Sequence, residues 1–122
     1  MGSVPSFLLR KLYVKGSLRN TDTGFEVTIQ NTLAPGTIVA LAPLQVDGME
    51  YPLHNIKAVL PDGRQVSAAD VSAQAPVRFT IGDKVVIRVE GQPLSVGRHT
   101  LTIAPKTMEA GTLDIQAEDV IA

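Results

Sequence analysis

The chain has 122 residues, a formal net charge of −1 and no cysteine. This length predicts a single domain spanning residues 1–122. Without cysteine the chain forms no disulfides and has no thiolate chemistry, which suits a reducing compartment, so we expect a cytoplasmic protein. Lysines and arginines are scattered singly, and no apolar run approaches the roughly 20 residues that span a bilayer, so we expect neither a nucleic-acid partner nor a membrane.

The first two strands are predicted from alternating residue types. Residues 8–15 are interpreted as a strand, and residues 21–24 as a turn in which glycine supplies a permissive backbone. Phe25, Val27 and Ile29 then alternate with polar residues, a pattern typical of a half-buried strand whose apolar face lies in the core.

A longer, irregular pair of strands follows. Residues 38–46 start with apolar residues on both faces, and Pro43 indicates an edge position or a bulge. Asp47 and Gly48 both tolerate positive φ, so they predict a two-residue type I′ hairpin turn. Residues 49–60 form the returning arm.

The second half of the chain alternates between strands and turns. Residues 67–70 have the Ser-x-x-acid spacing of a helix start and predict at most one turn of helix. Residues 77–81 and 84–90 are interpreted as a hairpin around Gly82 and Asp83, with Val85, Ile87 and Val89 facing inward. Residues 98–104 are interpreted as a strand with Leu101 and Ile103 inward and His99 in phase with them. The alternating residues Leu113, Ile115 and Ala117 mark the last strand.

These elements predict an all-β fold. About eight short strands with turn signals at roughly ten-residue spacing favour an antiparallel β-sandwich with at most one short helical turn. No strand–helix–strand alternation occurs, so a parallel sheet is not expected.

The sequence contains no recognisable catalytic constellation. His54 and His99 are far apart in sequence, and without cysteine a metal site would have to recruit carboxylates. No Gly-x-Ser-x-Gly motif and no glycine-rich phosphate loop is present. We therefore predict no catalytic, cofactor-binding or metal-binding residues and no cofactor.

One segment carries more apolar residues than a two-layer sandwich readily buries. Leu33, Ile38, Val39 and Leu41 do not alternate, so they require cover from the same chain or from another subunit. These four residues are the predicted partner surface.

Three short motifs carry a family resemblance: residues 15–20, residues 24–27 and the Val-Asp-Gly of residues 46–48. Over roughly the first half, the chain resembles the small (beta) subunit of bacterial C-glycoside deglycosidases and related uncharacterised proteins. That resemblance implies a β-sandwich accessory subunit beside a TIM-barrel subunit that carries the metal and the catalytic residues. Residues 11–20 also resemble short prokaryotic proteins labelled hydroxymethylglutaryl-CoA reductase.

The sequence leaves three functional hypotheses. The first is a non-catalytic accessory or interaction subunit of a larger enzyme complex, which self-associates or binds a larger protein subunit. The second is a β domain that binds a small apolar ligand between its sheets or in a barrel mouth. The third is a stand-alone enzyme with a His/carboxylate metal site.

Overall fold

The computed structural model describes residues 4–122. It contains one α-helix, α1 (Ser6–Leu9), and three 3-10 helices, η1 (Arg10–Leu12), η2 (Leu53–Asn55) and η3 (Ala68–Asp70). The remaining elements are thirteen strands: β1 (Arg19–Thr21), β2 (Gly24–Gln30), β3 (Gly36–Leu41), β4 (Leu44–Val46), β5 (Met49–Tyr51), β6 (Ile56–Val59), β7 (Gln65–Ser67), β8 (Val77–Phe79), β9 (Lys84–Glu90), β10 (Gly97–Ile103), β11 (Pro105–Thr107), β12 (Gly111–Thr112) and β13 (Ile115–Ile121).

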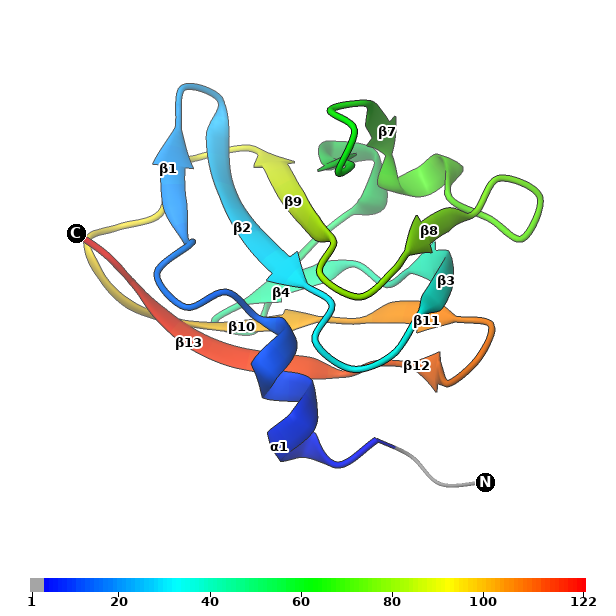
Figure 1. The fold of residues 1–122 in the computed structure, drawn as a ribbon. Helices are drawn as coiled ribbons and strands as arrows, with labels where there is room; N and C mark the ends of the chain where they lie inside the picture. The colour runs from blue at the N-terminus through cyan, green and yellow to red at the C-terminus, as the bar shows by residue number, and fades with distance from the viewer. Residues whose placement is uncertain (1–3) are drawn as a thin grey trace.

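The strands form two open layers, so the predicted antiparallel sandwich is confirmed (Figure 1). One layer is a five-stranded sheet in the order β1-β2-β9-β6-β7. The other comprises two four-stranded sheets, β13-β10-β4-β5 and β12-β11-β3-β8. All the described strand pairs are antiparallel. No helix in residues 4–122 is long and apolar enough to cross a membrane.

The two four-stranded sheets are halves of one bent layer. β10 runs into β11 after a break at Ala104, and β3 runs into β4 after a break at Ala42 and Pro43. Across the break, the Ala42 amide donates to the Ala104 carbonyl oxygen at 3.1 Å. The Leu113 amide donates likewise to the Pro105 carbonyl oxygen at 2.8 Å. Because the interruptions line up, the layer bends as a unit and wraps around the core.

The core is built from the alternating faces that the sequence predicted. Phe25, Val27 and Ile29 of β2 are buried, as are the inward residues of β9 and β10. Removing each such side chain from water contributes roughly 1.5–3 kcal/mol. The predicted turn at Asp47 and Gly48 is also confirmed, because their φ angles are 53° and 84° and they join β4 to β5.

The predicted strand over residues 8–15 is wrong. This segment forms the end of α1 and then η1, and only Tyr13 makes an isolated bridge, to Ile29. Leu9, Leu12 and Tyr13 are buried, and their spacing of three and four residues is that of one helix face. In so short a segment, the spacing of apolar residues is compatible with a strand and with a helix. Packing against the rest of the chain favours the helix.

The predicted hairpin of residues 77–81 and 84–90 is wrong in its pairing. The turn at Gly82 exists, but β8 pairs with β3 in one layer while β9 pairs with β2 and β6 in the other. Asn31 explains this corner: its side-chain amide donates to the Phe79 carbonyl oxygen at 2.7 Å, and its own carbonyl accepts the Gly82 amide at 2.8 Å. The end of β2 therefore occupies the position that a hairpin partner would take.

A β-bulge explains the apolar run in β3. Ile38 pairs with Thr107 and Ala40 with Lys106, so Val39 is an extra residue between two adjacent residues of β11. A bulge changes the phase of a strand by one residue. Ile38 and Leu41 consequently line the same interior cavity despite their odd spacing.

We expect Ile29→Asp and Ile87→Asp each to destabilise the domain by several kcal/mol, against a total stability of about 5–15 kcal/mol. Both side chains are buried, at 1% and 3% exposure, so each variant places a carboxylate in the apolar core. Urea denaturation measures the effect, with exposed Lys84→Asp on β9 as the control. Unchanged midpoints for the two isoleucine variants would contradict the assigned strand faces.

Candidate functional site

A buried carboxylate, Asp119 of β13, holds the N-terminal segment against the sandwich. Its Oδ2 atom accepts hydrogen bonds from the Tyr13 hydroxyl at 2.6 Å, the Gly16 amide at 2.9 Å and the Leu18 amide at 3.2 Å. Its Oδ1 atom accepts the Val120 amide at 2.8 Å. Because Asp119 is only 6% exposed, these donors replace the water that a carboxylate otherwise requires.

The surroundings of Asp119 also fix its protonation state. Burial alone would raise the pKa of Asp119, but the hydrogen bonds from Tyr13 and the three backbone amides outweigh burial and lower the pKa. Burial, and then the hydrogen bond to Asp119, raise the pKa of the Tyr13 phenol. The pair therefore stays as a donating phenol and an accepting carboxylate at neutral pH, which makes it a structural tie.

A second polar cluster surrounds His99 of β10, which faces inward in phase with Leu101, as the sequence predicted. The His99 Nδ1 atom lies 2.6 Å from Asp47 Oδ2, and Nε2 lies 2.8 Å from the Ser95 carbonyl oxygen. Both partners are acceptors, so only the imidazolium, with a proton on each nitrogen, satisfies both. The Ser95 carbonyl and, next, the Asp47 carboxylate raise the pKa of His99.

Asp47 of the hairpin turn connects this cluster to the backbone. Its Oδ1 atom accepts the Thr100 amide at 2.8 Å, while its own amide donates to the Thr100 carbonyl oxygen at 2.8 Å. The Thr100 amide first, and the His99 ring second, lower the pKa of Asp47. The Val-Asp-Gly turn therefore holds β10 and the loop before it in place. Asp47 and His99 both serve the structure in this cluster.

A third cluster lies on the five-stranded sheet. The side chain of Glu26 is 7% exposed and lies between Arg19 Nε at 2.7 Å and Arg88 Nε at 3.1 Å. Both arginines reach solvent, so they neutralise the buried carboxylate from the water side. Within residues 4–122, no buried side-chain nitrogen or oxygen lacks a hydrogen-bond partner.

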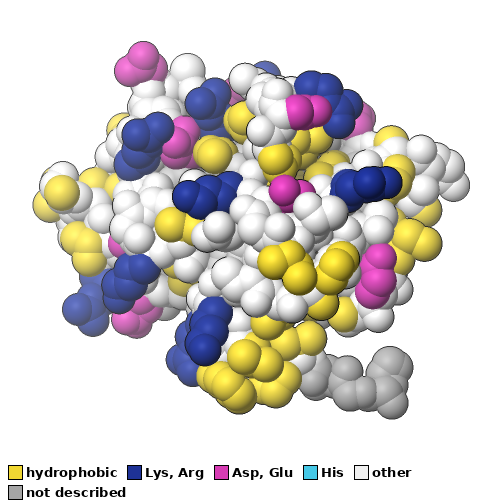
Figure 2. Space-filling view, in the orientation of Figure 1, with side chains coloured by type: hydrophobic (Ala, Val, Ile, Leu, Met, Phe, Trp, Pro, Cys, Tyr) yellow, Lys and Arg dark blue, Asp and Glu magenta, His cyan; other side chains and the backbone are white. Residues whose placement is uncertain are grey.

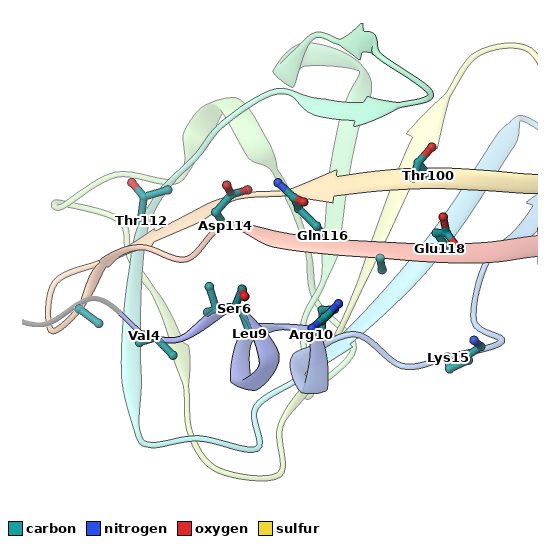
Figure 3. A pocket seen from close by; sticks show the side chains of 12 residues that line it. Val4, Ser6, Leu9, Arg10, Lys15, Thr100, Thr112, Asp114, Gln116 and Glu118 are labelled. Carbon is teal, nitrogen blue, oxygen red and sulfur yellow. The ribbon is translucent and has the colours of Figure 1, made fainter.

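An open groove of about 760 Å³ runs between α1 and β13 (Figure 3). Arg10 and Lys15 line its helical side, and Asp114, Gln116 and Glu118 line its strand side. No ion pair joins either of these cations to these carboxylates in the part of the chain that the structure describes. Glu118 instead meets Arg98 of β10 at 3.7 Å, whereas Arg10, Lys15 and Asp114 form no ion pair among the described residues.

The helix beside this groove carries apolar side chains on two sides. Leu9 is buried against the sandwich, whereas Phe7 is 57% exposed. Val4 and Leu8 are partly exposed. Hydrophobic side chains gather over α1 at the bottom of Figure 2. We call Val4, Phe7 and Leu8 the helix surface.

The predicted partner residues occupy different environments. Ile38 is buried in the core, while Leu33 and Leu41 are partly buried and pack against the core. Val39, the bulged residue, is partly exposed. The chain therefore covers part of this segment itself, and the interface at these residues stays a prediction.

The predicted histidines do not meet in a metal site. His54 lies exposed on η2, and both ring nitrogens of buried His99 are already bonded. Among residues 4–122, no group of three or more histidine or acidic side chains is placed to hold a metal ion. The interior cavity between the sheets has a volume of about 10 Å³, about the minimum that a water molecule requires.

The tie between Tyr13 and Asp119 was missed in the sequence, although a signal was present. Asp119 continues the inward series of Ile115, Ala117 and Ile121 on β13. A carboxylate at an inward strand position requires a buried donor. The interpretation of residues 8–15 as a strand did not identify the Tyr13 hydroxyl as that donor.

The fold and these clusters define a β-sandwich module whose buried polar groups serve its own structure. The chain belongs to the family described as hydroxymethylglutaryl-CoA reductase, N-terminal domain, because the family's sequence model matches residues 8–122. This match confirms the resemblance to short proteins with that label and extends it over nearly the whole chain. No curated protein matches the chain.

We expect Asp119→Ala to destabilise the protein by about 3 kcal/mol, because it leaves the Tyr13 hydroxyl and several amides without an acceptor. Tyr13→Phe removes one donor and costs about 1–2 kcal/mol. Urea denaturation measures both, and hydrogen exchange of residues 13–18 reports the loosened segment. Asp114→Ala, which removes an exposed carboxylate of the same region, is the control, and we expect it to change the free energy of unfolding by no more than about 0.5 kcal/mol. Equal effects of Asp119→Ala and Asp114→Ala would contradict the tie.

We expect the contribution of His99 to stability to fall as pH rises. Its pKa is raised in the folded state, so the stabilisation is complete below the unfolded pKa of about 6.5 and is lost as pH rises through the folded pKa. Urea denaturation from about pH 5.5 to about pH 8.5 compares the wild type with Asp47→Asn. The wild type loses its advantage over the variant across this range, and His54→Gln is the exposed-histidine control. A constant difference would show that Asp47 does not shift the protonation equilibrium of His99.

Proposed function

We propose that the chain is a non-catalytic interaction module that assembles with a larger enzyme subunit. The observation that carries this proposal is the helix surface: Phe7 is 57% exposed on α1, the helix whose Ser6 and Leu9 line the open groove. A contiguous exposed apolar patch, unlike a single exposed side chain, marks an interaction site, and clefts are where ligands bind. The buried polar clusters support the same function, because their groups are bonded within the chain.

The partner that we propose is a TIM-barrel subunit acting on glycosides. Its basis is the resemblance of residues 15–20, 24–27 and 46–48 to the small subunit of C-glycoside deglycosidases. The family description names a reductase, but we do not assign that activity to this chain alone. The described strand pairs are antiparallel, whereas the usual dinucleotide site is built on parallel βαβ units.

Self-association is the second proposed mode of assembly, and Val39 is the residue of the sequence-derived surface that tests it. A small-ligand domain is less well supported, because the cavity beside Ile38 has a volume of about 10 Å³ and the apolar pocket beside Leu33 about 110 Å³, both below the usual size of a ligand pocket. A reducing compartment such as the cytoplasm remains the proposed location, since the chain has no cysteine.

Affinity capture of the tagged chain from its native host, followed by mass spectrometry and light scattering, tests the module. We expect capture of a larger enzyme subunit, and we expect Phe7→Asp to weaken that complex by about tenfold or more, because it places a charge in an apolar contact. Ile81→Asp is the matched control, since Ile81 is 60% exposed and lies in the turn between β8 and β9. Val39→Lys tests the bulge of β3 in the same assay.

Two results would contradict this function. A wild-type chain that is monomeric and captures no subunit would show that it works alone. Equal weakening by Phe7→Asp and Ile81→Asp would show that the helix surface is not the contact. Urea midpoints of all variants check that a loss of binding does not come from unfolding.

A further inference from the structure

The edge of β13 beside the groove presents unpaired backbone groups. In its sheet the order is β13-β10-β4-β5, so β13 pairs with β10 on one side only. Seven residue pairs join β10 to β13, from Gly97 with Ile121 to Ile103 with Ile115. The other side of the strand faces α1 across the groove (Figure 3).

The pattern of hydrogen bonds along β10 shows which residues of β13 direct their backbone amide and carbonyl groups away from β10. Thr100 of β10 uses both its amide and its carbonyl toward Asp47, on the β4 side. Residues of an antiparallel ladder bond alternately to one neighbour and to the other. His99 and Leu101 therefore bond to β13, and their partners there are Asp119 and Ala117.

The residues between these partners direct their backbone groups toward the open edge. They are Gln116, Glu118 and Val120, and the Val120 amide confirms the phase because it bonds the Asp119 side chain instead of β10. At that end, the Asp119 carboxylate and the N-terminal segment close the edge. Within residues 4–122, no hydrogen bond outside the strand ladders satisfies the backbone of Gln116 or Glu118.

A row of alternating unpaired amides and carbonyls matches one kind of ligand, an extended polypeptide that adds a strand to the sheet. From Asp114 to Glu118 the edge is about 13 Å long at strand spacing. The groove of about 760 Å³ beside it has the size of a ligand cleft.

The charged side chains of β13 determine which extended segments can pair with its edge. Residues 111–122 contain three acidic residues and no basic one. A second copy pairing edge to edge would place the Asp114 and Glu118 carboxylates of both copies along one seam, which like-charge repulsion disfavours. Glu118 already meets Arg98 at 3.7 Å, so a segment with lysine or arginine side chains complements the Asp114 carboxylate first. Arg10 and Lys15 lie on the far wall, so a strand bonded to β13 meets the carboxylates first.

We propose that the β13 edge at residues 114–118 binds an extended, basic segment of the partner subunit by strand addition. This inference deepens the proposed function and rests on it for the identity of the partner. Val4, Ser6 and Leu9, at and before α1, line the groove across from this edge (Figure 3). The partner would therefore contact two walls, through an apolar contact on α1 and through backbone pairing on β13.

A defined peptide tests the edge without the partner. The probe is a hexapeptide of alternating lysine and valine, and its control is the same sequence with alternate backbone nitrogens methylated. In nuclear magnetic resonance titrations at millimolar peptide, we expect amide shifts centred on residues 114–118 and slower exchange of the Gln116 and Glu118 amides. The methylated peptide retains the charge but loses the donors, so equal shifts with both peptides would overturn strand addition. Absence of shifts at residues 114–118 with the first peptide would also overturn it.

Two substitutions at one position separate backbone recognition from side-chain recognition. Gln116→Pro removes an outward amide that bonds nothing in the fold and blocks pairing, which an edge strand tolerates. Gln116→Thr changes the side chain but keeps the amide. We expect Gln116→Pro to weaken the peptide and the captured subunit by about tenfold or more and Gln116→Thr to leave both near wild type. Urea midpoints confirm that both variants fold.

The outcomes for the edge and for the module are distinguishable. If Phe7→Asp abolishes capture while Gln116→Pro binds the subunit as the wild type does, strand addition is wrong and the interaction module stands. If the peptide binds at residues 114–118 but no subunit is captured, the proposed function fails while the edge remains a site for an extended basic segment.

Discussion

The hydrogen bonds to the Asp119 carboxylate are the constraint on which the rest of the structure depends. They join residues that are more than a hundred positions apart, because Tyr13 and Gly16 lie near the start of the chain and Asp119 lies near its end. A buried carboxylate is costly without hydrogen-bond donors. The N-terminal segment must therefore lie where Tyr13, Gly16 and Leu18 can donate to Asp119 of the final strand. That position places Leu9 and Leu12 under the open side of the sandwich, where they complete the core.

The same constraint creates the groove. Asp119 closes the edge of β13 at one end, and α1 runs beside the rest of the strand without pairing with it. Sheet edges in soluble proteins are normally covered, charged or paired. In this family member the edge carries Asp114 and Glu118, and the helix next to it exposes Phe7. The arrangement combines protection against self-pairing with the surface that the proposed partner segment would use.

Local chemistry made several elements predictable. Asp47 and Gly48 tolerate positive φ, so the turn between β4 and β5 follows from these two residues alone. Phe25, Val27 and Ile29 alternate, and period-two burial leaves them one face to occupy. The pairing of β8 was not predictable in this way. The turn at Gly82 is compatible with a hairpin or a corner, and the choice depends on Asn31, which is distant in sequence but adjacent in space.

The sequence by itself determined the all-β class, the positions of most turns and the inward faces of β2, β9 and β10, because these depend on backbone preference and on alternation between neighbours. Tertiary structure alone decided the helix at Ser6–Leu9, the bulge at Val39 and the division of strands between the two layers. It also decided which carboxylates are structural. Asp119, Glu26 and Asp47 acquire donors from distant segments, whereas Asp114 and Glu118 remain in the groove. A residue type states which bonds a side chain can make, and only the packed chain brings the partners within reach.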